Sequence, residues 1–237
     1  MRNVHTNASP LKRMASFLPS GIQQRMRSWK LNVDFELRRF RSNEPEFQLL
    51  PEWLSPGDWI LDVGANVGHY TMRMSDLVGP SGRVIAFEPI LETAEILTRI
   101  AAKAKHRNIT ILNVGLSEHT SIQSFHVPKS ETGLPNYFEA QIACNGEQKA
   151  LCIAIDDLSF PERIALVKVD VEGHEAEILN GMRRLILRDH PILIMEANEL
   201  IYRGFLAQHG YKMNARLPKS PNLVFTPERF VCSGARQ

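Results

Sequence analysis

The sequence predicts an α/β fold, in which a doubly wound, mostly parallel sheet is covered by helices on both faces. Short apolar runs alternate with segments of helical periodicity, and the links between them are short. This alternation is typical of parallel sheets, which bind ligands at the carboxyl ends of their strands. Asp62, Glu88, Asp170 and Glu196 all follow or end such runs. We therefore expect the functional site at that edge of the sheet.

Length and composition are typical of one soluble domain with an N-terminal extension. The chain has 237 residues, of which 43% are hydrophobic and 23% charged. We assign residues 1–56 to a basic helical extension and residues 57–237 to the domain. No apolar stretch approaches the roughly 20 residues of a membrane helix. Three cysteines without metal-binding spacing favour the reducing cytoplasm.

Charge is unevenly distributed along the chain. Residues 1–41 hold nine Lys and Arg against two acidic residues, a net charge of +7, whereas the remainder has 19 basic and 24 acidic residues, a net charge of −5. Such an arm can steer a protein toward nucleic acid, anionic lipid or an anionic substrate, or fold back on its own domain. Nucleic acid is disfavoured because the arm has no RNA-binding signature and few aromatic residues.

The N-terminal extension is expected to be helical but interrupted. Residues 11–29 have helical character, and the Pro-Ser-Gly sequence at 19–21 should divide them into short helices rather than one rod. Residues 44–54 carry apolar side chains at helical spacing. The Ser-Pro-Gly sequence at 55–57 should end that helix before the first strand.

The first half of the domain reads as three strands linked by two helices. Residues 59–63 form an apolar run, and a glycine-containing turn then leads into a helix over 67–78. A second strand follows at 83–88, and a crossover helix over 91–104 buries one apolar face. The third strand covers 109–114.

The turn at residues 64–68 predicts a nucleotide cofactor without a pyrophosphate. Glycine is needed where the backbone adopts positive φ or touches a ligand, so we expect the ligand to lie against the main chain. A dinucleotide fingerprint requires glycine where Asn66 and His69 stand, and no Gly-Lys-Ser/Thr sequence occurs. Glu88 can accept hydrogen bonds from vicinal ribose hydroxyls. Asp62 would repel a pyrophosphate but suits an ammonium and a sulfonium, which favours S-adenosylmethionine.

The middle of the chain is less regular. Residues 121–127 and 148–155 read as strands, and 138–144 is a possible third. The polar segment 128–136 lies between them. We interpret it as an insertion beside the site, either a flap that contacts the acceptor or a dimer contact.

The fourth strand, at residues 164–171, carries the most informative charges. Side chains alternate across a strand, so Lys168, Asp170 and Glu172 should project to one side if the strand persists that far. A lysine in an apolar strand needs a partner, which Asp170 or a carboxylate on a neighbouring strand can supply. Gly173 then permits a sharp exit into a helix that begins at Glu175 and continues through residue 186.

The end of the chain completes the sheet. We expect a fifth strand at 192–195, a helix over 200–208, a sixth strand from residue 211 and a seventh at 222–226.

Several motifs occur in the order seen in FkbM-type methyltransferases. They are DVGANVG at 62–68, FEP at 87–89, NVGLS at 113–117, DDL at 156–158, KVDVEGHE at 168–175 and the segment 191–196. The resemblance covers roughly residues 57–225 and implies a seven-strand, Rossmann-like class I fold. It also implies an S-adenosylmethionine-dependent O-methyltransferase. Relatives modify natural products and sugars, and one of similar length 2-O-methylates fucose in nodulation factors, so a small-molecule or glycan acceptor is expected.

The predicted cofactor site gathers around the glycine turn and the second strand. Glu88 would hold the ribose, and Asp62 would orient the loop and the methionine ammonium. Ser117 would approach the adenine or simply form a turn. The full predicted set is Asp62, Gly64, Ala65, Asn66, Gly68, Tyr70, Glu88 and Ser117, with Thr71 as an alternative to Tyr70 near the methionine.

Methyl transfer to a hydroxyl needs a base, and the candidates follow the fourth and fifth strands. They are Asp170, Glu172 and His174, then Glu196 and His69. The favoured interpretation of His174 is a surface histidine at a helix start, and that of His69 is packing behind the loop. Asp170, Glu196 and Asn198 could instead hold Mg²⁺, but no spacing fixes three ligands on one ion, so no metal site is predicted. The rival functions are an RNA methyltransferase and a non-catalytic cofactor-binding module.

Overall fold

The computed structural model describes residues 17–36, 42–130, 133–196, 202–214 and 220–228, and within them the predicted seven-stranded sheet is confirmed. The strand order is β10-β11-β9-β8-β1-β2-β3. Neighbouring strands run parallel from β9 to β3, whereas β11 is antiparallel to both β9 and β10. The strands are β1 (Trp59–Val63), β2 (Arg83–Phe87), β3 (Ile109–Leu112), β8 (Ile164–Val169), β9 (Ile192–Met195), β10 (Tyr211–Met213) and β11 (Leu223–Pro227).

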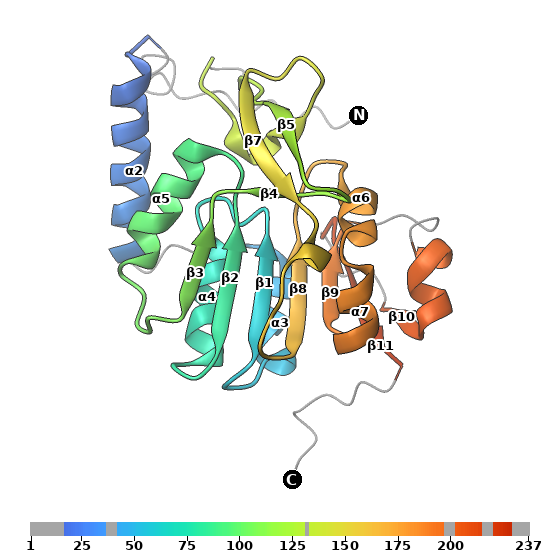
Figure 1. The fold of residues 1–237 in the computed structure, drawn as a ribbon. Helices are drawn as coiled ribbons and strands as arrows, with labels where there is room; N and C mark the ends of the chain where they lie inside the picture. The colour runs from blue at the N-terminus through green and yellow to red at the C-terminus, as the bar shows by residue number, and fades with distance from the viewer. Residues whose placement is uncertain (1–16, 37–41, 131–132, 197–201, 215–219, 229–237) are drawn as a thin grey trace.

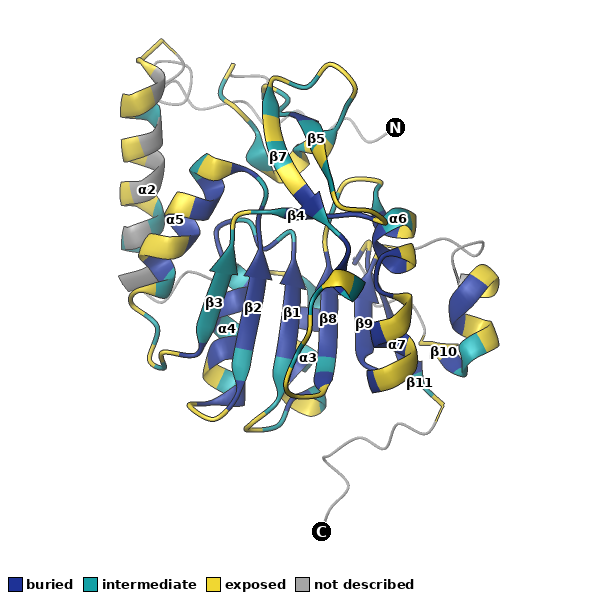
Figure 2. Cartoon of the chain, in the orientation of Figure 1, coloured by how far each residue is buried: buried dark blue, intermediate teal, exposed yellow. Residues whose placement is uncertain are grey.

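Helices cover both faces of this sheet, as the doubly wound prediction requires (Figure 1). On one face, α3 (Pro45–Trp53) and α4 (His69–Val78) pack against a cluster that includes Ile60, Leu166 and Ile194. On the other face, α6 (Glu175–Asn180) and α7 (Arg183–Asp189) pack against a cluster that includes Leu61 and Val167. Alternate residues of each strand thus enter different cores. Figure 2 shows the central strands as the most buried part of the molecule.

A second sheet stands over the carboxyl ends of the main strands (Figure 1). Its order is β4-β7-β5-β6, with β4 (Gly115–Leu116), β5 (Ser121–His126), β6 (Gln141–Ile142) and β7 (Gln148–Ile153). The two longer strands were predicted. The possible strand at 138–144 is reduced to β6, which follows the short 3₁₀ helix η1 (Tyr137–Glu139).

The break predicted at residues 19–21 coincides with a helix start, and the described residues before it, 17–19, are not helical. A single helix, α2 (Ser20–Glu36), begins there and continues past Trp29. The carbonyl of Pro19 accepts hydrogen bonds from the amides of Ile22 (2.9 Å) and Gln23 (3.1 Å). Proline fits a helix start because the first amides need no intrahelical partner. Residues 11–16 lie outside the described chain.

The helix predicted from Glu175 to residue 186 is two helices, α6 and α7, separated at Gly181. A Cβ at Gly181 would collide with the backbone carbonyl of Ser117, and the Gly181 carbonyl accepts a bond from the Asp156 amide at 2.8 Å. This close approach of the η2 turn (Ile155–Asp157) diverts the backbone from a continuous helix.

Several other elements are shorter than predicted. Helix α5 covers Leu91–Ala101, and β3 and β8 end two residues early. The helix expected at 200–208 is a π-helical turn, η3 (Tyr202–Leu206), followed by the 3₁₀ turn η4 (Ala207–His209), while residues 200 and 201 are not described. Of the described helices, none has the length and apolar character needed to cross a membrane.

Candidate functional site

Two hollows lie at the carboxyl edge of the main sheet. The first, here called the apolar hollow, lies beneath the second sheet and holds about 640 Å³ of empty space that includes open solvent; Phe87, Leu116, Phe125 and Ile142 are among its walls. The second, here called the acidic hollow, holds about 1090 Å³ on the same measure and is lined by five carboxylates. The carboxylates are Glu44, Asp62, Asp170, Glu172 and Glu196. The two hollows share Gly64, Asn66, Phe138, Asp170, Val171 and Glu172.

The glycine turn is shaped by contacts within the chain. Gly64 has φ +74°, and a Cβ there would collide with the backbone carbonyl of Asp170. Gly68 has φ +96°, and a Cβ there would meet the side chain of Leu97 on α5. Positive φ, one of the two reasons for glycine given by the sequence, thus applies at both positions, and contacts with Asp170 and Leu97 add a second constraint. The expected contact of a ligand with the main chain stays a prediction.

The turn presents none of its own amides to a phosphate. All five backbone N–H groups from residue 64 to residue 68 donate to acceptors within the chain. A phosphate-binding loop works by leaving such groups free for the ligand. The hydrogen bonds of the turn therefore agree with the glycine spacing, which also argues against a pyrophosphate-containing cofactor.

Glu88 is a buried and rigidly held carboxylate on the wall of the apolar hollow. Its side chain accepts hydrogen bonds from the amide of Asn66 (2.8 Å) and from the amide of Ile90 (2.9 Å), one at each oxygen. The residue is only 5% exposed. Since a carboxylate oxygen has a second lone pair, both oxygens can also accept from a ligand. These two hydrogen bonds fix the orientation of the Glu88 carboxylate, to which a vicinal diol could donate.

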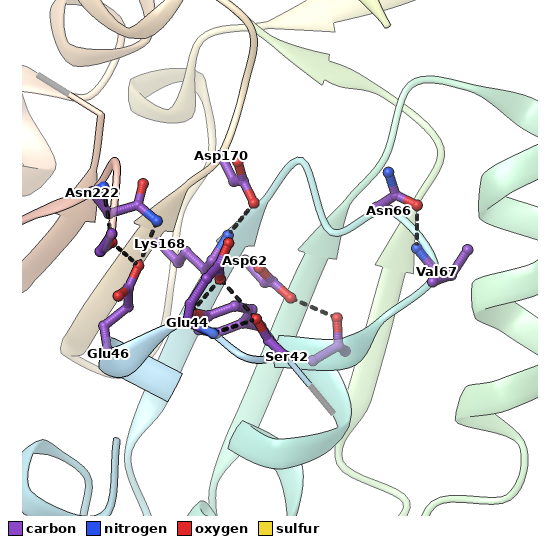
Figure 3. A network of polar contacts seen from close by, with 12 residues as sticks. Ser42, Glu44, Glu46, Asp62, Asn66, Val67, Lys168, Asp170 and Asn222 are labelled. Atoms are coloured by element: carbon purple, nitrogen blue, oxygen red, sulfur yellow. Dashed lines mark hydrogen bonds and ion pairs between the residues drawn. The ribbon is translucent and has the colours of Figure 1, made fainter. Parts of the chain in front are cut away.

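Lys168 lies at the centre of a charged network at the ends of β8 and β1 (Figure 3). Its ammonium is 2.6 Å from Asp170 Oδ2 and 4.3 Å from the centre of the Tyr70 ring, and the side chain is 2% exposed. Asp62 pairs with it in strand register. Burial opposes the charge, but the Asp170 and Asp62 carboxylates outweigh it and hold the pKa of Lys168 above its ordinary value. The predicted partner for this lysine is confirmed as Asp170.

Asp62 is buried with one carboxylate oxygen unpaired. Its Oδ2 accepts a hydrogen bond from Thr71 Oγ1 at 2.6 Å, whereas Oδ1 has no partner among the described protein groups. Burial raises the pKa of Asp62, and Lys168 opposes that rise. A buried unpaired oxygen on the lining of the acidic hollow is a position that a donor such as an ammonium would satisfy.

The residues just before α3 form one wall of the acidic hollow, and the sequence patterns did not predict it. Tyr70 donates to Glu44 Oε2 at 2.6 Å, and Ser42 donates to the same oxygen at 3.0 Å. Burial, and then the hydrogen bond to Glu44, raise the pKa of the Tyr70 phenol. Nothing in local periodicity links Glu44 to a residue 26 positions later. The only feature of the sequence that marks Glu44 is its position directly before Pro45, at the start of a helix.

The candidate bases divide between the two hollows. Asp170 and Glu172 line both, whereas Glu196 lines only the acidic one. Strand β8 ends at Val169, so Glu172 lies beyond the strand alternation used to predict its direction. Burial raises the pKa of Glu172, and the neighbouring Glu196 and Asp170 add to that rise.

The two candidate histidines have different surroundings. His174 lines the apolar hollow, and its Nε2 lies 3.0 Å from Ser117 Oγ while Nδ1 faces Glu177 at 3.5 Å. Ser117 lines neither hollow, although its neighbours Gly115 and Leu116 line the apolar one. His69 lines the acidic hollow, and burial lowers the pKa of its imidazole. Among the described residues, no group of three or more His, Cys, Asp or Glu is arranged to hold a metal ion, and Asn198 lies outside them.

Comparison with known proteins points to one family. The family model described as Methyltransferase FkbM domain matches residues 62–218. A hexuronic acid methyltransferase, AglP, of Haloferax volcanii is 30% identical over 167 residues, which are 69% of this chain and 66% of the relative. A protein-L-isoaspartate O-methyltransferase of Methanothrix thermoacetophila is 23% identical over 163 residues, covering 67% of this chain and 66% of the relative.

A solved structure shares the fold. The crystal structure of Methyltransferase FkbM from Methylobacillus flagellatus KT aligns with a TM-score of 0.54 and 20% identity, over 73% of this chain and 44% of that one. This chain thus spans slightly less than two thirds of the curated relatives and less than half of the crystallised one.

Replacing Lys168 tests the charged network. We expect Lys168→Met to lower the free energy of unfolding at pH 7 by about 3–5 kcal/mol, because Asp62 is left as a buried charge. Exposed Lys149→Met is the matched control and should change stability by less than about 0.5 kcal/mol. Urea denaturation measures both, and a loss for Lys168→Met no larger than the control's would contradict the network.

The loss of stability in the Lys168→Met variant should also depend on pH, and it should be larger at neutral than at acid pH. The pKa of Asp62 is raised in the fold, and removing Lys168 removes the charge that opposes that rise. A carboxyl whose folded pKa is raised stabilises the fold below its ordinary value of 3.8, and that contribution is lost as the pH rises through the folded pKa. The difference between wild type and variant should therefore grow from acid to neutral pH. Adding Asp62→Asn should recover part of it.

Proposed function

Because the chain belongs to the FkbM methyltransferase family, we propose that it transfers the methyl group of S-adenosylmethionine to a hydroxyl of a neutral sugar or glycan-like acceptor. The observation that carries this proposal is the meeting of two unlike hollows at the ends of β1 and β8. The first has mostly apolar walls with the fixed carboxylate of Glu88, the second is lined by five carboxylates, and Asp170 and Glu172 border both. A donor in the first and an acceptor in the second would meet beside Asp170 and Glu172.

The apolar hollow suits the nucleoside half of S-adenosylmethionine. Leu116, Phe125 and Ile142 offer apolar surface to a flat purine, while Glu88 offers two anchored oxygens to the ribose diol. The methionine ammonium would reach the unpaired Oδ1 of Asp62. The sulfonium would then lie near the shared carboxylates, which favour a positive charge.

The reaction that follows is an in-line displacement. The acceptor oxygen forms a bond to the methyl carbon, the carbon–sulfur bond breaks, and its electron pair stays on sulfur as a neutral thioether. Orienting the two reactants contributes up to roughly 7–11 kcal/mol of barrier lowering. We assign the hydroxyl proton to Glu172, because its raised pKa makes it a better base than Asp170, whose carboxylate is held by Lys168.

The acidic hollow favours an acceptor without negative charge. Its five carboxylates face one lysine, and that lysine is already paired with Asp170. A uronate or a phosphodiester would add like charge to a partly desolvated site, at a cost in binding. Neutral hydroxyls can instead donate to the carboxylates. A neutral deoxysugar such as the fucose of nodulation factors is compatible with this proposal, whereas an RNA backbone is disfavoured.

A labelling experiment tests the proposed function. Protein is incubated with S-adenosylmethionine carrying a labelled methyl group and with three acceptor sets, namely neutral sugars and chitooligosaccharides, the matching uronic acids, and RNA. We expect label in the neutral set, in a form that resists mild alkali because it is an ether. Label in RNA, or label released as methanol from a carboxyl ester, would contradict the proposal.

Glu88→Ala tests the ribose contact. Loss of two hydrogen bonds to a charged acceptor should weaken S-adenosylmethionine binding by about 100-fold in calorimetry. Glu95→Ala removes an exposed carboxylate of α5 and is the control, expected to leave the affinity unchanged. Circular dichroism checks that the Glu88 variant is folded, and near-wild-type affinity in that variant would rule out the assignment.

Glu172→Gln tests the base. We expect kcat to fall by about 10²- to 10⁴-fold while cofactor affinity stays unchanged. In the wild type, activity should decline as the pH falls through the pKa of Glu172, which lies above the ordinary value of 4.5, since only the ionised carboxylate accepts a proton. The variant should lack that acid limb, and the exposed Glu162→Gln control should keep it. An unchanged pH profile in Glu172→Gln would exclude this residue as the base.

A further inference from the structure

Helix α2 contacts the domain through the side that carries Leu31. Leu31 packs against a cluster formed by Val67, Met72, Ile96 and Ile100, and α2 lies alongside α5 (Figure 1). The position of α2 is therefore fixed by its inward side. Its outward side remains to be explained.

The outward side carries an apolar stripe. Leu18 precedes the first helical residue by two positions, and Ile22, Met26 and Trp29 follow at intervals of four, four and three residues. This spacing places Ile22, Met26 and Trp29 on one face of α2, about half a turn from Leu31, and Leu18 lies just before the helix start. All four are exposed, Trp29 to 68%. In Figure 2 most of the coloured positions of α2 are exposed.

Basic residues border this stripe. Arg25 and Lys30 are exposed and, at 100° per residue, lie on opposite edges of it. The surrounding segment, residues 1–41, has a net charge of +7. An apolar face that includes tryptophan and is flanked by Lys and Arg is typical of helices that lie in the plane of a membrane interface.

We propose that α2 binds the surface of an anionic lipid bilayer, with the stripe of Leu18, Ile22, Met26 and Trp29 inserted among the acyl chains and Arg25 and Lys30 at the headgroups. The charge of the segment favours lipid over a second copy of the chain, because pairing two such helices would bring like charges together. The stripe favours lipid over RNA, because it presents apolar side chains where phosphates would lie. The proposal does not depend on methyl transfer.

Vesicle sedimentation tests the proposal with the full chain. Wild-type protein should sediment with phosphatidylglycerol-containing vesicles and bind phosphatidylcholine vesicles at least about tenfold more weakly. Replacing Ile22, Met26 and Trp29 by serine should weaken binding to the anionic vesicles by about tenfold or more. Arg25→Gln with Lys30→Gln should weaken it similarly and reduce its salt dependence. The control Ile122→Ser removes an apolar side chain that is 65% exposed on β5 and should have no effect.

A second measurement leaves the helix unaltered. Lipids brominated in the acyl chain should quench a tryptophan signal that is missing from the Trp29→Phe variant, since Trp53 on α3 and Trp59 on β1 pack against the core clusters of the main sheet. Equal sedimentation of the triple-serine variant and wild type would overturn the proposal, and so would absence of quenching. Self-association of the wild type that the triple-serine change abolishes, without vesicle binding, would assign the stripe to a second copy. RNA binding without vesicle binding would assign the charge to nucleic acid.

Discussion

The buried ammonium of Lys168 sets the arrangement of the site. It stands in a central strand and is closed off from water, so it stays charged only with carboxylates beside it. Asp62 and Asp170 supply that charge from the ends of two adjacent strands. The Asp170 backbone also approaches Gly64 so closely that no side chain fits there. The position of the turn and the charge between the two hollows thus follow from one interaction.

Local patterns predicted the strands, their number and the edge that carries the acids, because alternation and strand-end carboxylates are properties of neighbouring residues. They also identified Lys168 as needing a partner. They failed where distant segments meet. The break at Gly181 depends on the backbone of Ser117, and the contact of Tyr70 with Glu44 spans 26 positions. The sequence predicted that position 64 requires glycine. It did not predict that the group packed against Gly64 is the Asp170 carbonyl, because residue spacing does not show which distant segment lies there.

The family match covers the residues of the two hollows to different extents. The family match begins at residue 62, so it includes the turn, Glu88 and the motif around Lys168 but not Ser42 or Glu44. Those two residues form part of the acidic hollow; Glu44 accepts a hydrogen bond from the Tyr70 hydroxyl, and Ser42 donates to the same Glu44 oxygen. The family match therefore covers the surroundings of Glu88 and Lys168 but not the wall formed by Ser42 and Glu44.

The second sheet is drawn from one continuous stretch, residues 115–153, inserted between two strands of the main sheet. Its residues roof the apolar hollow, yet all its strand partners are its own. The insert is nevertheless packed against the main sheet at its first residues, because Leu116 enters the main core and the Ser117 carbonyl leaves no room for a side chain at Gly181. Engineers who exchange this roof between proteins would therefore place the crossover after Ser117 to keep the junction intact.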